Sequence, residues 1–360
     1  MGRAVGTVAK DATTVNMVPV GGIAQVFRSG DAYKAVGEIV SRAAYPALSA
    51  AFPLAGSLDT QVISPNTNFT PSGYAYGAGI IVGVGYGSGV ATTVTLSYDG
   101  REWFTVPVAG GYWNCIAYGA GVFCALTTDG KVMTSPDGIT WTARANLAAG
   151  TWNGITFGGG KFVAVQGNNS AVAASSTDGI TFTPRTLPTA SNWVDVIYAG
   201  GQYLAVASSS NAGATSPDGV TWTARAMPSA SGIVGRIAYG AGRYVVTATS
   251  GQIYSSADGI TWTTYVSGVG SFQFAVFGNG VFIAFSQASS GVAFTSYDGI
   301  NWKRRTLMAT GISGAVNGSY FAGVFSILTV TASIALFAEN ITDSDYLYLR
   351  GTAGQFVRVK

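Results

Sequence analysis

Ser135-Pro136-Asp137-Gly138-Ile139-Thr140-Trp141 is one copy of a seven-residue motif, called the phrase below, that occurs six times in the chain. The copies begin at Ser97, Ser135, Ser176, Ser216, Ser256 and Ser296, so successive spacings are 38, 41, 40, 40 and 40 residues. A fixed period of this length is typical of stacked supersecondary units. The phrase therefore predicts an array of similar units rather than one irregular core.

The residue types within the phrase indicate a turn between two strands. A short Asp side chain accepts hydrogen bonds from the N–H groups just ahead of it, and the following Gly tolerates positive φ. The Ser hydroxyl adds a local bond, and the aromatic residue four positions after the Asp places a large ring in the next strand. We expect a purely structural role for these aspartates: Asp99, Asp137, Asp178, Asp218, Asp258 and Asp298.

The residues around each copy follow a common order. A strand ends in aromatic-Gly-x-Gly, a second apolar strand follows, and a third strand leads into the phrase; 116–123 and 155–162 show the first hairpin. Short, evenly spaced strands with Gly turns, in a chain with 50 Gly and only 10% charged residues, predict an all-β radial array of four-stranded blades. Since turns alternate between the two ends of the strands, we expect every phrase on one face and the variable loops on the other.

The phrase resembles the Asp-box of sialidase-like β-propellers, and the resemblance covers roughly residues 72–302. It implies a β-propeller domain, to which we assign residues 57–360. We favour seven blades over six, because 315–322 resembles the opening hairpin and Phe356 suits the aromatic position of a degraded seventh box, with 355–360 as the last outer strand. Members include glycosidases, assembly factors and adhesive virion proteins, so the resemblance leaves the activity open.

Residues 1–56 stand outside the repeat and form a predicted attachment segment. Within them, 40–48 (VSRAAYPAL) is similar to a phrase of phage tail-collar and tail-fibre proteins. This similarity implies a virion protein of the tail, made in the host cytoplasm, joined to other tail proteins through residues 1–56 and homo-oligomeric in the particle. A capsid-decorating propeller is the structural alternative.

Composition argues against several other functions. The net charge of +3 comes with no dense basic stripe, which disfavours nucleic-acid binding, and no uninterrupted apolar run reaches the length of a membrane span. The absence of His removes the usual base of nucleophilic triads and the usual ligand of transition metals. We expect no cofactor, no metal and no catalytic residue; a sialidase-like hydrolase is the enzyme alternative, although the Phe-Arg-Ile-Pro type phrase of that family is absent.

One aligned column suggests a ligand site on the face opposite the phrases. The inner strands begin with large rings followed by amides: Trp113 and Asn114, Trp152 and Asn153, Trp193, and Phe272 and Gln273. Aromatic faces beside amides suit sugar rings, which predicts contact with a host surface polysaccharide near the channel mouth. The alternative is that these rings pack between blades.

Two smaller patterns leave alternatives open. An Arg follows the box aromatic by three residues at Arg144, Arg185, Arg225 and Arg305, either to meet anionic phosphates or to protect an exposed strand edge. Cys115 and Cys124 flank the turn at 118–121, so a regular hairpin centred there places them opposite each other. We expect reduced core thiols, because cytosolic synthesis disfavours disulfides.

Overall fold

The structure is a computed structural model that describes residues 70–86, 91–98, 104–208, 210–228, 233–268, 270–286, 292–307, 315–321, 324–329, 334–337, 346–347, 349–350 and 356–357. Strands and turns make up these residues, so the all-β prediction is confirmed for them. The predicted attachment segment, residues 1–56, and its boundary at residue 57 lie outside the described residues and stay predictions.

The strands fall into repeated units, numbered here in chain order. Unit 1 holds β1 (Thr70–Gly77), β2 (Ile80–Tyr86), β3 (Ala91–Ser97) and β4 (Phe104–Gly111); unit 2 holds β5 (Trp113–Gly119), β6 (Val122–Thr127), β7 (Val132–Ser135) and β8 (Thr142–Arg144). Unit 3 holds β9 (Trp152–Gly158), β10 (Lys161–Gln166), β11 (Ser170–Ser176) and the first part of β12 (Thr183–Ala199). Unit 4 holds the rest of β12, β13 (Gln202–Ser208), β14 (Ala212–Ser216) and β15 (Thr223–Ala226).

The second half of the chain continues the pattern. Unit 5 holds β16 (Ile233–Gly240), β17 (Arg243–Ala248), β18 (Gln252–Ser256) and β19 (Thr263–Val266); unit 6 holds β20 (Phe272–Gly278), β21 (Val281–Ser286), β22 (Val292–Ser296) and β23 (Lys303–Leu307). Unit 7 holds β24 (Ala315–Phe321), β25 (Val324–Thr329) and β26 (Ile334–Phe337). The last strands are β27 (Tyr346–Leu347), β28 (Leu349–Arg350) and β29 (Phe356–Val357).

Each unit is an antiparallel meander in which neighbours in sequence pair in order. Units 3 and 4 form one continuous sheet because β12 pairs with β11 through its first half and with β13 through its second half. β27 adds in parallel to the outer strand β23, and β28 pairs with β29. The prediction that 355–360 forms the outer strand after β26 is therefore wrong: the described part of that stretch, β29, bonds to β28 instead.

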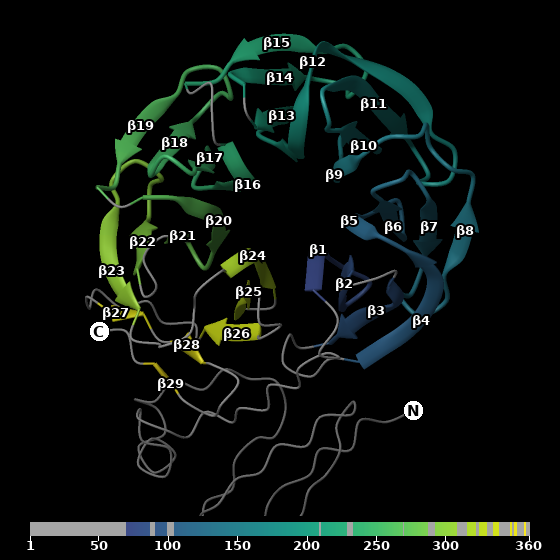
Figure 1. The fold of residues 1–360 in the computed structure, drawn as a ribbon, viewed down its shortest axis with the longest axis horizontal. Coiled ribbons are helices and arrows are strands. Elements are labelled where there is room, and N and C mark those ends of the chain that lie inside the picture. The colour runs from purple at the N-terminus through teal and green to yellow at the C-terminus, as the bar shows by residue number, and fades with distance from the viewer. Residues whose placement is uncertain are drawn as a thin grey trace, which may run out of the picture. The chain divides into compact units, whose positions relative to one another are not determined.

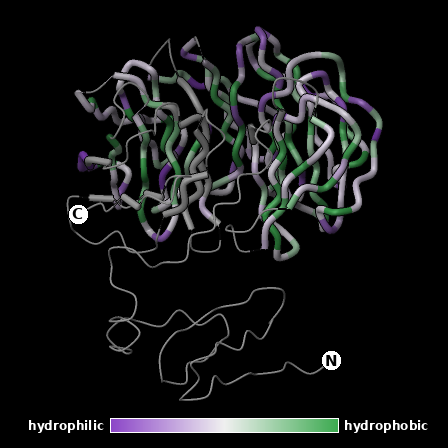
Figure 2. The backbone as a smooth tube through the Cα atoms, turned by 60° about the horizontal axis from the view of Figure 1, so that its bottom comes forward, coloured by the Kyte–Doolittle hydropathy of each residue, from purple (hydrophilic) through white to green (hydrophobic). Residues whose placement is uncertain are grey.

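The units stand in a ring, with the first strand of each unit innermost (Figure 1). These inner strands touch in cyclic order, from β1 through β5, β9, β12, β16, β20 and β24 and back to β1. Apolar side chains pack between successive sheets; for example, Cys115 and Leu126 of unit 2 share a cluster with Trp152 and Phe162 of unit 3. Apolar stretches follow the strands, and hydrophilic residues gather at turns (Figure 2). The core is thus a series of layers between units.

In units 1–6 the strands of the first hairpin are joined by a two-residue turn with both residues at positive φ. In unit 2 these are Ala120 (φ 48°) and Gly121 (φ 78°), and in unit 6 they are Asn279 (φ 46°) and Gly280 (φ 75°). Such turns match the right-handed twist of paired strands. The turn is centred between residues 120 and 121, so Ala117 pairs with Cys124 and Cys115 with Leu126. The prediction that the cysteines lie opposite each other is wrong, because Cys115 lies two residues before Ala117, the partner of Cys124. Both cysteines are free, buried thiols as expected.

The glycine that ends the inner strand in units 1, 2, 3, 5 and 6 has a packing role that the sequence did not suggest. A Cβ added to Gly119 would overlap the ring of Phe157 in unit 3, and one on Gly278 would overlap Tyr320 in unit 7. The same relation joins Gly77 to Tyr118, Gly158 to Tyr198 and Gly240 to Phe277. In each of these five units, a ring of the next unit therefore packs directly against the glycine backbone.

Candidate functional site

The turn chemistry predicted from the repeated phrase is present in the described boxes. In unit 2, Asp137 Oδ1 accepts the N–H groups of Ile139 and Thr140 at 2.9 and 2.8 Å and the hydroxyl of Ser135 at 2.9 Å. Trp141 Nε1 donates to the carbonyl of Gly138 at 2.9 Å, whose φ is 72°. Asp178, Asp218, Asp258 and Asp298 repeat the carboxylate bonds, and Asp99 lies outside the described residues. These bonds lower the pKa of the box carboxyls.

Each of these turns rests on the first hairpin of the preceding unit. Lys161 Nζ donates to the carbonyl of Asp218 at 3.1 Å, and Gln202 Nε2 donates to that of Asp258 at 2.7 Å. The Cys124 thiol lies 3.6 Å from the carbonyl of Gly179. The boxes and the hairpin turns therefore share one face of the ring, as turn parity predicts.

The column of rings that was expected to meet sugars is buried. Trp113, Trp152, Trp193 and Phe272 are at most 2% exposed. The indole N–H groups are used internally: Trp113 donates to the carbonyl of Ala109 and Trp152 to that of Ala148, at 3.1 and 3.0 Å, and Trp193 does the same to Thr189. Because the chain that crosses from the preceding unit bonds to the three indole rings, the burial matches the alternative interpretation, packing between units. These rings offer no free face for a sugar, which corrects the predicted site.

The amides after these rings also join units. Asn114 Nδ2 donates to the carbonyl of Trp152 at 2.9 Å, and Asn153 Nδ2 donates to that of Trp193 at 2.8 Å. Ser72 Oγ makes the corresponding bond to the carbonyl of Trp113 at 2.8 Å. The side chain of Gln273 lies outside the described residues. The amide column is thus a set of links between neighbouring inner strands.

One ion pair among the inner strands was not anticipated from the sequence. Asp195 of unit 4 is buried; its Oδ2 accepts the N–H of Ile237 at 2.8 Å, and its Oδ1 lies 3.9 Å from Arg236 Nη1 of unit 5. Arg236 Nη2 also donates to the carbonyl of Ser72 in unit 1. Burial raises the pKa of Asp195, and Arg236 opposes that rise. The pair links units 4 and 5 to unit 1.

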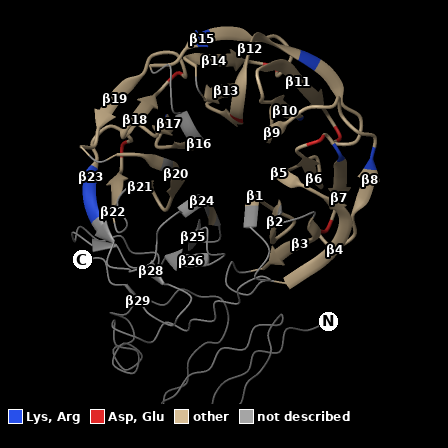
Figure 3. Cartoon of the chain, viewed as in Figure 1, with Lys and Arg blue, Asp and Glu red and all other residues tan. Residues whose placement is uncertain are grey.

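The arginine column occupies the outer part of the units (Figure 3). The Nε atoms of Arg144, Arg185 and Arg225 each donate at 2.8 Å to a hydroxyl of the third strand: Thr134, Ser175 and Thr215. Arg305 makes the same bond to Thr295 at 2.9 Å and is buried. In unit 5 the position holds Tyr265, and Arg243 from the second strand bonds Ser255 instead. These bonds tie the guanidinium groups to their own sheets.

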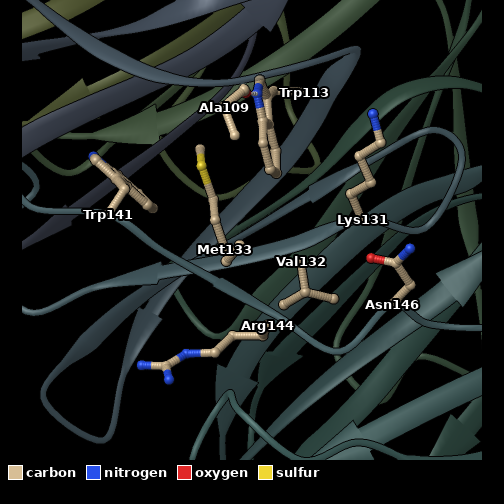
Figure 4. A pocket seen from close by; sticks show the side chains of 9 residues that line it. Ala109, Trp113, Lys131, Val132, Met133, Trp141, Arg144 and Asn146 are labelled. Carbon is tan, nitrogen blue, oxygen red and sulfur yellow. Dashed lines mark hydrogen bonds between the residues drawn. The ribbon is translucent and has the colours of Figure 1, made fainter.

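Two grooves open on units 2 and 3. The first has a volume of about 100 Å³, and its lining includes Trp113, Met133, Trp141, Lys131 and Asn146. The Met133 side chain lies between the two indole rings, while the Lys131 and Arg144 side chains extend in different directions (Figure 4). The first groove therefore has an apolar floor, with one amide and two cationic side chains around it.

The second groove occupies the equivalent place one unit further on. It has a volume of about 210 Å³ and is lined by Trp152, Ala173, Ala174, Phe182 and Pro184, the counterparts of Trp113, Val132, Met133, Trp141 and Ala143. The larger volume follows from Ala174 in place of Met133. Asn146 lines both grooves, so the pair forms one polar-edged apolar surface. Sequence reasoning missed it because it combines a unit wall with the segment that crosses from the preceding unit.

Comparison with known proteins places the fold. No known family model and no curated protein matches the sequence. A catalytically inactive virginiamycin B lyase from Staphylococcus aureus, solved with quinupristin, is similar with a TM-score of 0.65 at 12% identity, over 75% of this chain and 95% of that one. YCF48 from Cyanidioschyzon merolae is similar with a TM-score of 0.59 at 16% identity, over 78% and 98%. The fold is a β-propeller.

The units are therefore blades of a propeller, and the likeness extends no further than the fold. A computationally designed protein, Ika8, is as similar to this propeller, with a TM-score of 0.59 at 12% identity over 84% of this chain and 99% of that one. In the part of the chain that the structure describes, no helix has the length and apolar character needed to cross a membrane. The same residues contain no group of three or more His, Cys, Asp or Glu side chains placed to hold a metal.

Proposed function

We propose that this propeller is a component of a bacteriophage tail or tail fibre that binds polysaccharide of the host surface without chemically changing it. The ring has seven blades, which the closed circle of inner-strand contacts supports. Residues 1–56, with their tail-collar-like run, join it to other tail proteins in a homo-oligomeric assembly.

The paired grooves carry the binding part of the proposal. A linear polysaccharide repeats along its length, and two equivalent grooves one blade apart, sharing Asn146, present a repeating surface to it. Sugar rings have apolar C–H faces that pack on the partly exposed rings of Trp141 and Phe182, and hydroxyls that bond to amides. Lys131 and Arg144 at the first groove favour polymers with carboxylate or phosphate groups. The contact surface is thus on the walls of blades 2 and 3.

The test uses the full chain with host cells and isolated envelope polysaccharide, measuring bound protein and released reducing sugar in the same tube. We expect saturable binding without release. Asn146→Ala removes an exposed amide shared by both grooves, so affinity should fall about fivefold, the effect of one hydrogen bond. Thr140→Ala, at an exposed box tip of the same blade, is the matched control and should bind as the unmodified chain does.

A second variant tests the shape of the surface. Ala174→Met places in the second groove the side chain that narrows the first one, so binding should weaken if both grooves hold the polymer. Released sugar would replace the proposal with a sialidase-like hydrolase. Neither binding nor release, together with location of the protein at the head, would favour a capsid-decorating propeller.

A further inference from the structure

The outer edge of blade 5 lacks the residues that protect the other outer edges. Its last strand, β19 (Thr263–Val266), ends the sheet, and among the described residues no strand pairs with its outer side. An exposed edge can pair with another chain, and charged residues or proline usually prevent this. β19 has neither (Figure 3), whereas the outer strands of blades 1–4 and 6 have at least one: Pro107, Arg144, Pro184 and Arg185, Arg225, and Lys303, Arg304 and Arg305.

The side chains of β19 suit pairing with a further strand. Val266 is 68% exposed, more than any other large apolar side chain among the described residues. Thr264, on the same face of the sheet, is also exposed. Tyr265 points to the other face, where its ring centre lies 6.1 Å from that of Phe294 in blade 6. Because β-branched and aromatic residues stabilise strands when they lie opposite each other, this edge is uncharged and well suited to pairing.

The equivalent positions in other blades indicate which partner the edge accepts. When two copies of one strand pair about a two-fold axis, the residue on the axis lies opposite its own copy. At the position of Tyr265, four other blades have an arginine: Arg144, Arg185, Arg225 and Arg305. Self-pairing of those strands would place two like charges opposite each other, which is destabilising. Among the described outer strands of blades 2–6, only β19 can therefore meet a second copy without this repulsion.

We propose that two copies of this chain pair through β19 as antiparallel strands about a two-fold axis, so that blade 5 of each ring joins one continuous sheet. Tyr265 lies opposite its own copy, and Thr264 lies opposite Val266 of the second copy, because opposed residues share a face of the sheet. The strands are short and bury little area, so the dimer is weak and reversible. The pairing goes beyond the proposed function, since it rests on β19 and not on polysaccharide binding.

Sedimentation equilibrium of the full chain tests the pairing, at concentrations from about 10 μM to about 1 mM, where weak contacts form. We expect a reversible monomer–dimer equilibrium. Val266→Lys places a charge on the exposed edge, and Tyr265→Arg introduces the residue of the other blades. Each variant should weaken dimerisation about tenfold. Ala226→Lys, at the position of Val266 on β15, is the matched control and should dimerise as the unmodified chain does.

Hydrogen exchange of the unmodified chain gives a readout that no substitution can disturb. The amides of β19 that face outward should exchange about tenfold more slowly at the highest concentration than at the lowest, whereas those of β15 should not change. A chain that stays monomeric, an oligomer that both β19 variants leave intact, or unchanged exchange in β19 would each overturn the proposal. Neither measurement involves polysaccharide, so such a failure is distinguishable from a failure of the proposed polysaccharide binding.

Discussion

The box carboxylate shows how one side chain holds a turn. The N–H groups of Thr261 and Ile260 lower the pKa of Asp258 from 3.8 to about 2 by donating to its ionised form. A carboxyl whose pKa is lower in the folded state contributes stability above its unfolded pKa, and that contribution is lost as the pH falls through the folded value. The relevant window here lies between about pH 4 and pH 2.

Asp258→Asn should therefore flatten part of the pH dependence of stability. The free energy of unfolding, measured with urea between pH 7 and pH 2, should fall less steeply below pH 4 in this variant than in the unmodified chain. Asp258→Ala also removes the acceptor and should cost about 1 kcal/mol at pH 7. Asp129→Asn, in an exposed loop, is the control; a pH profile altered as much by it as by Asp258→Asn would contradict the assignment.

Ala120 occupies a left-handed position in the first hairpin of blade 2, at φ 48°. The equivalent residue in blade 6 is Asn279, at φ 46°, and Asn tolerates this region better than Ala. Ala120→Asn should therefore raise the free energy of unfolding by about 0.5–1 kcal/mol, measured by urea denaturation. Asn279→Ala makes the reverse change and should lower it; equal stability in both pairs would refute the strain argument.

The same turn explains what sequence reasoning could and could not reach at single positions. The aspartate and glycine of the box dictate their own local hydrogen bonds, so the box turn was predictable. The cysteine pairing depended on the centre of the hairpin, and the left-handed Ala120-Gly121 pair moves that centre by one residue. Composition around the turn, Tyr118 to Gly121, does not distinguish the two centres.

At the scale of elements, the contact between Gly119 and Phe157 is the most sensitive joint between blades. Gly119→Ala should lower the free energy of unfolding by about 1–3 kcal/mol, because the new methyl overlaps the ring of the next blade. In a Phe157→Ala background the same change should cost much less, because the overlapping ring is gone. Urea denaturation of the four chains measures this coupling; additive losses would contradict the packing argument.

The aromatic column shows that the neighbours of a strand determine whether its side chains are free to bind a ligand. Large rings at the start of inner strands were predictable from alignment of the repeats, but their burial depends on the segment that crosses from the preceding blade. That segment supplies Ala109, Ala148 and Thr189, whose carbonyls accept the indole N–H groups. The grooves on blades 2 and 3 also depend on these crossing segments. The period of the sequence predicts that a groove on one blade recurs on the next, but it does not predict that a groove forms.

At the scale of the whole molecule, the Asp195–Arg236 pair joins blades 4 and 5, and Arg236 also bonds to Ser72 of blade 1. Arg236→Leu leaves a buried carboxylate without its cation and should cost about 3 kcal/mol of unfolding free energy. Adding Asp195→Asn should recover much of that loss. Lys131→Leu breaks an exposed pair of the same 3.9 Å length, to Asp129, and should change stability by about 0.5 kcal/mol or less. If both pairs respond alike in urea denaturation, burial is not the deciding factor.

The ring itself was largely readable from the sequence, because a 40-residue period with Gly turns leaves few other architectures. The Asp195–Arg236 ion pair was not predictable from the sequence, because neither residue interrupts the repeat and nothing near either one indicates its partner. The last outer strand was misplaced because Phe356 was positioned by its distance from Trp302, whereas β29 bonds to β28 in the structure.

The contact of ring on glycine has a direction, and that direction bears on how such a chain grows during evolution. Blades 1, 2, 3, 5 and 6 each place a glycine against an aromatic ring of the next blade, whereas the inner strand of blade 4 ends in Ala199. A duplicated stretch running from just after Gly119 to Gly158 would bring both halves of the joint with it. Duplication or deletion of one such period therefore leaves the neighbouring glycine–ring contacts complete. Selection then acts on the number of blades in the ring rather than on these contacts.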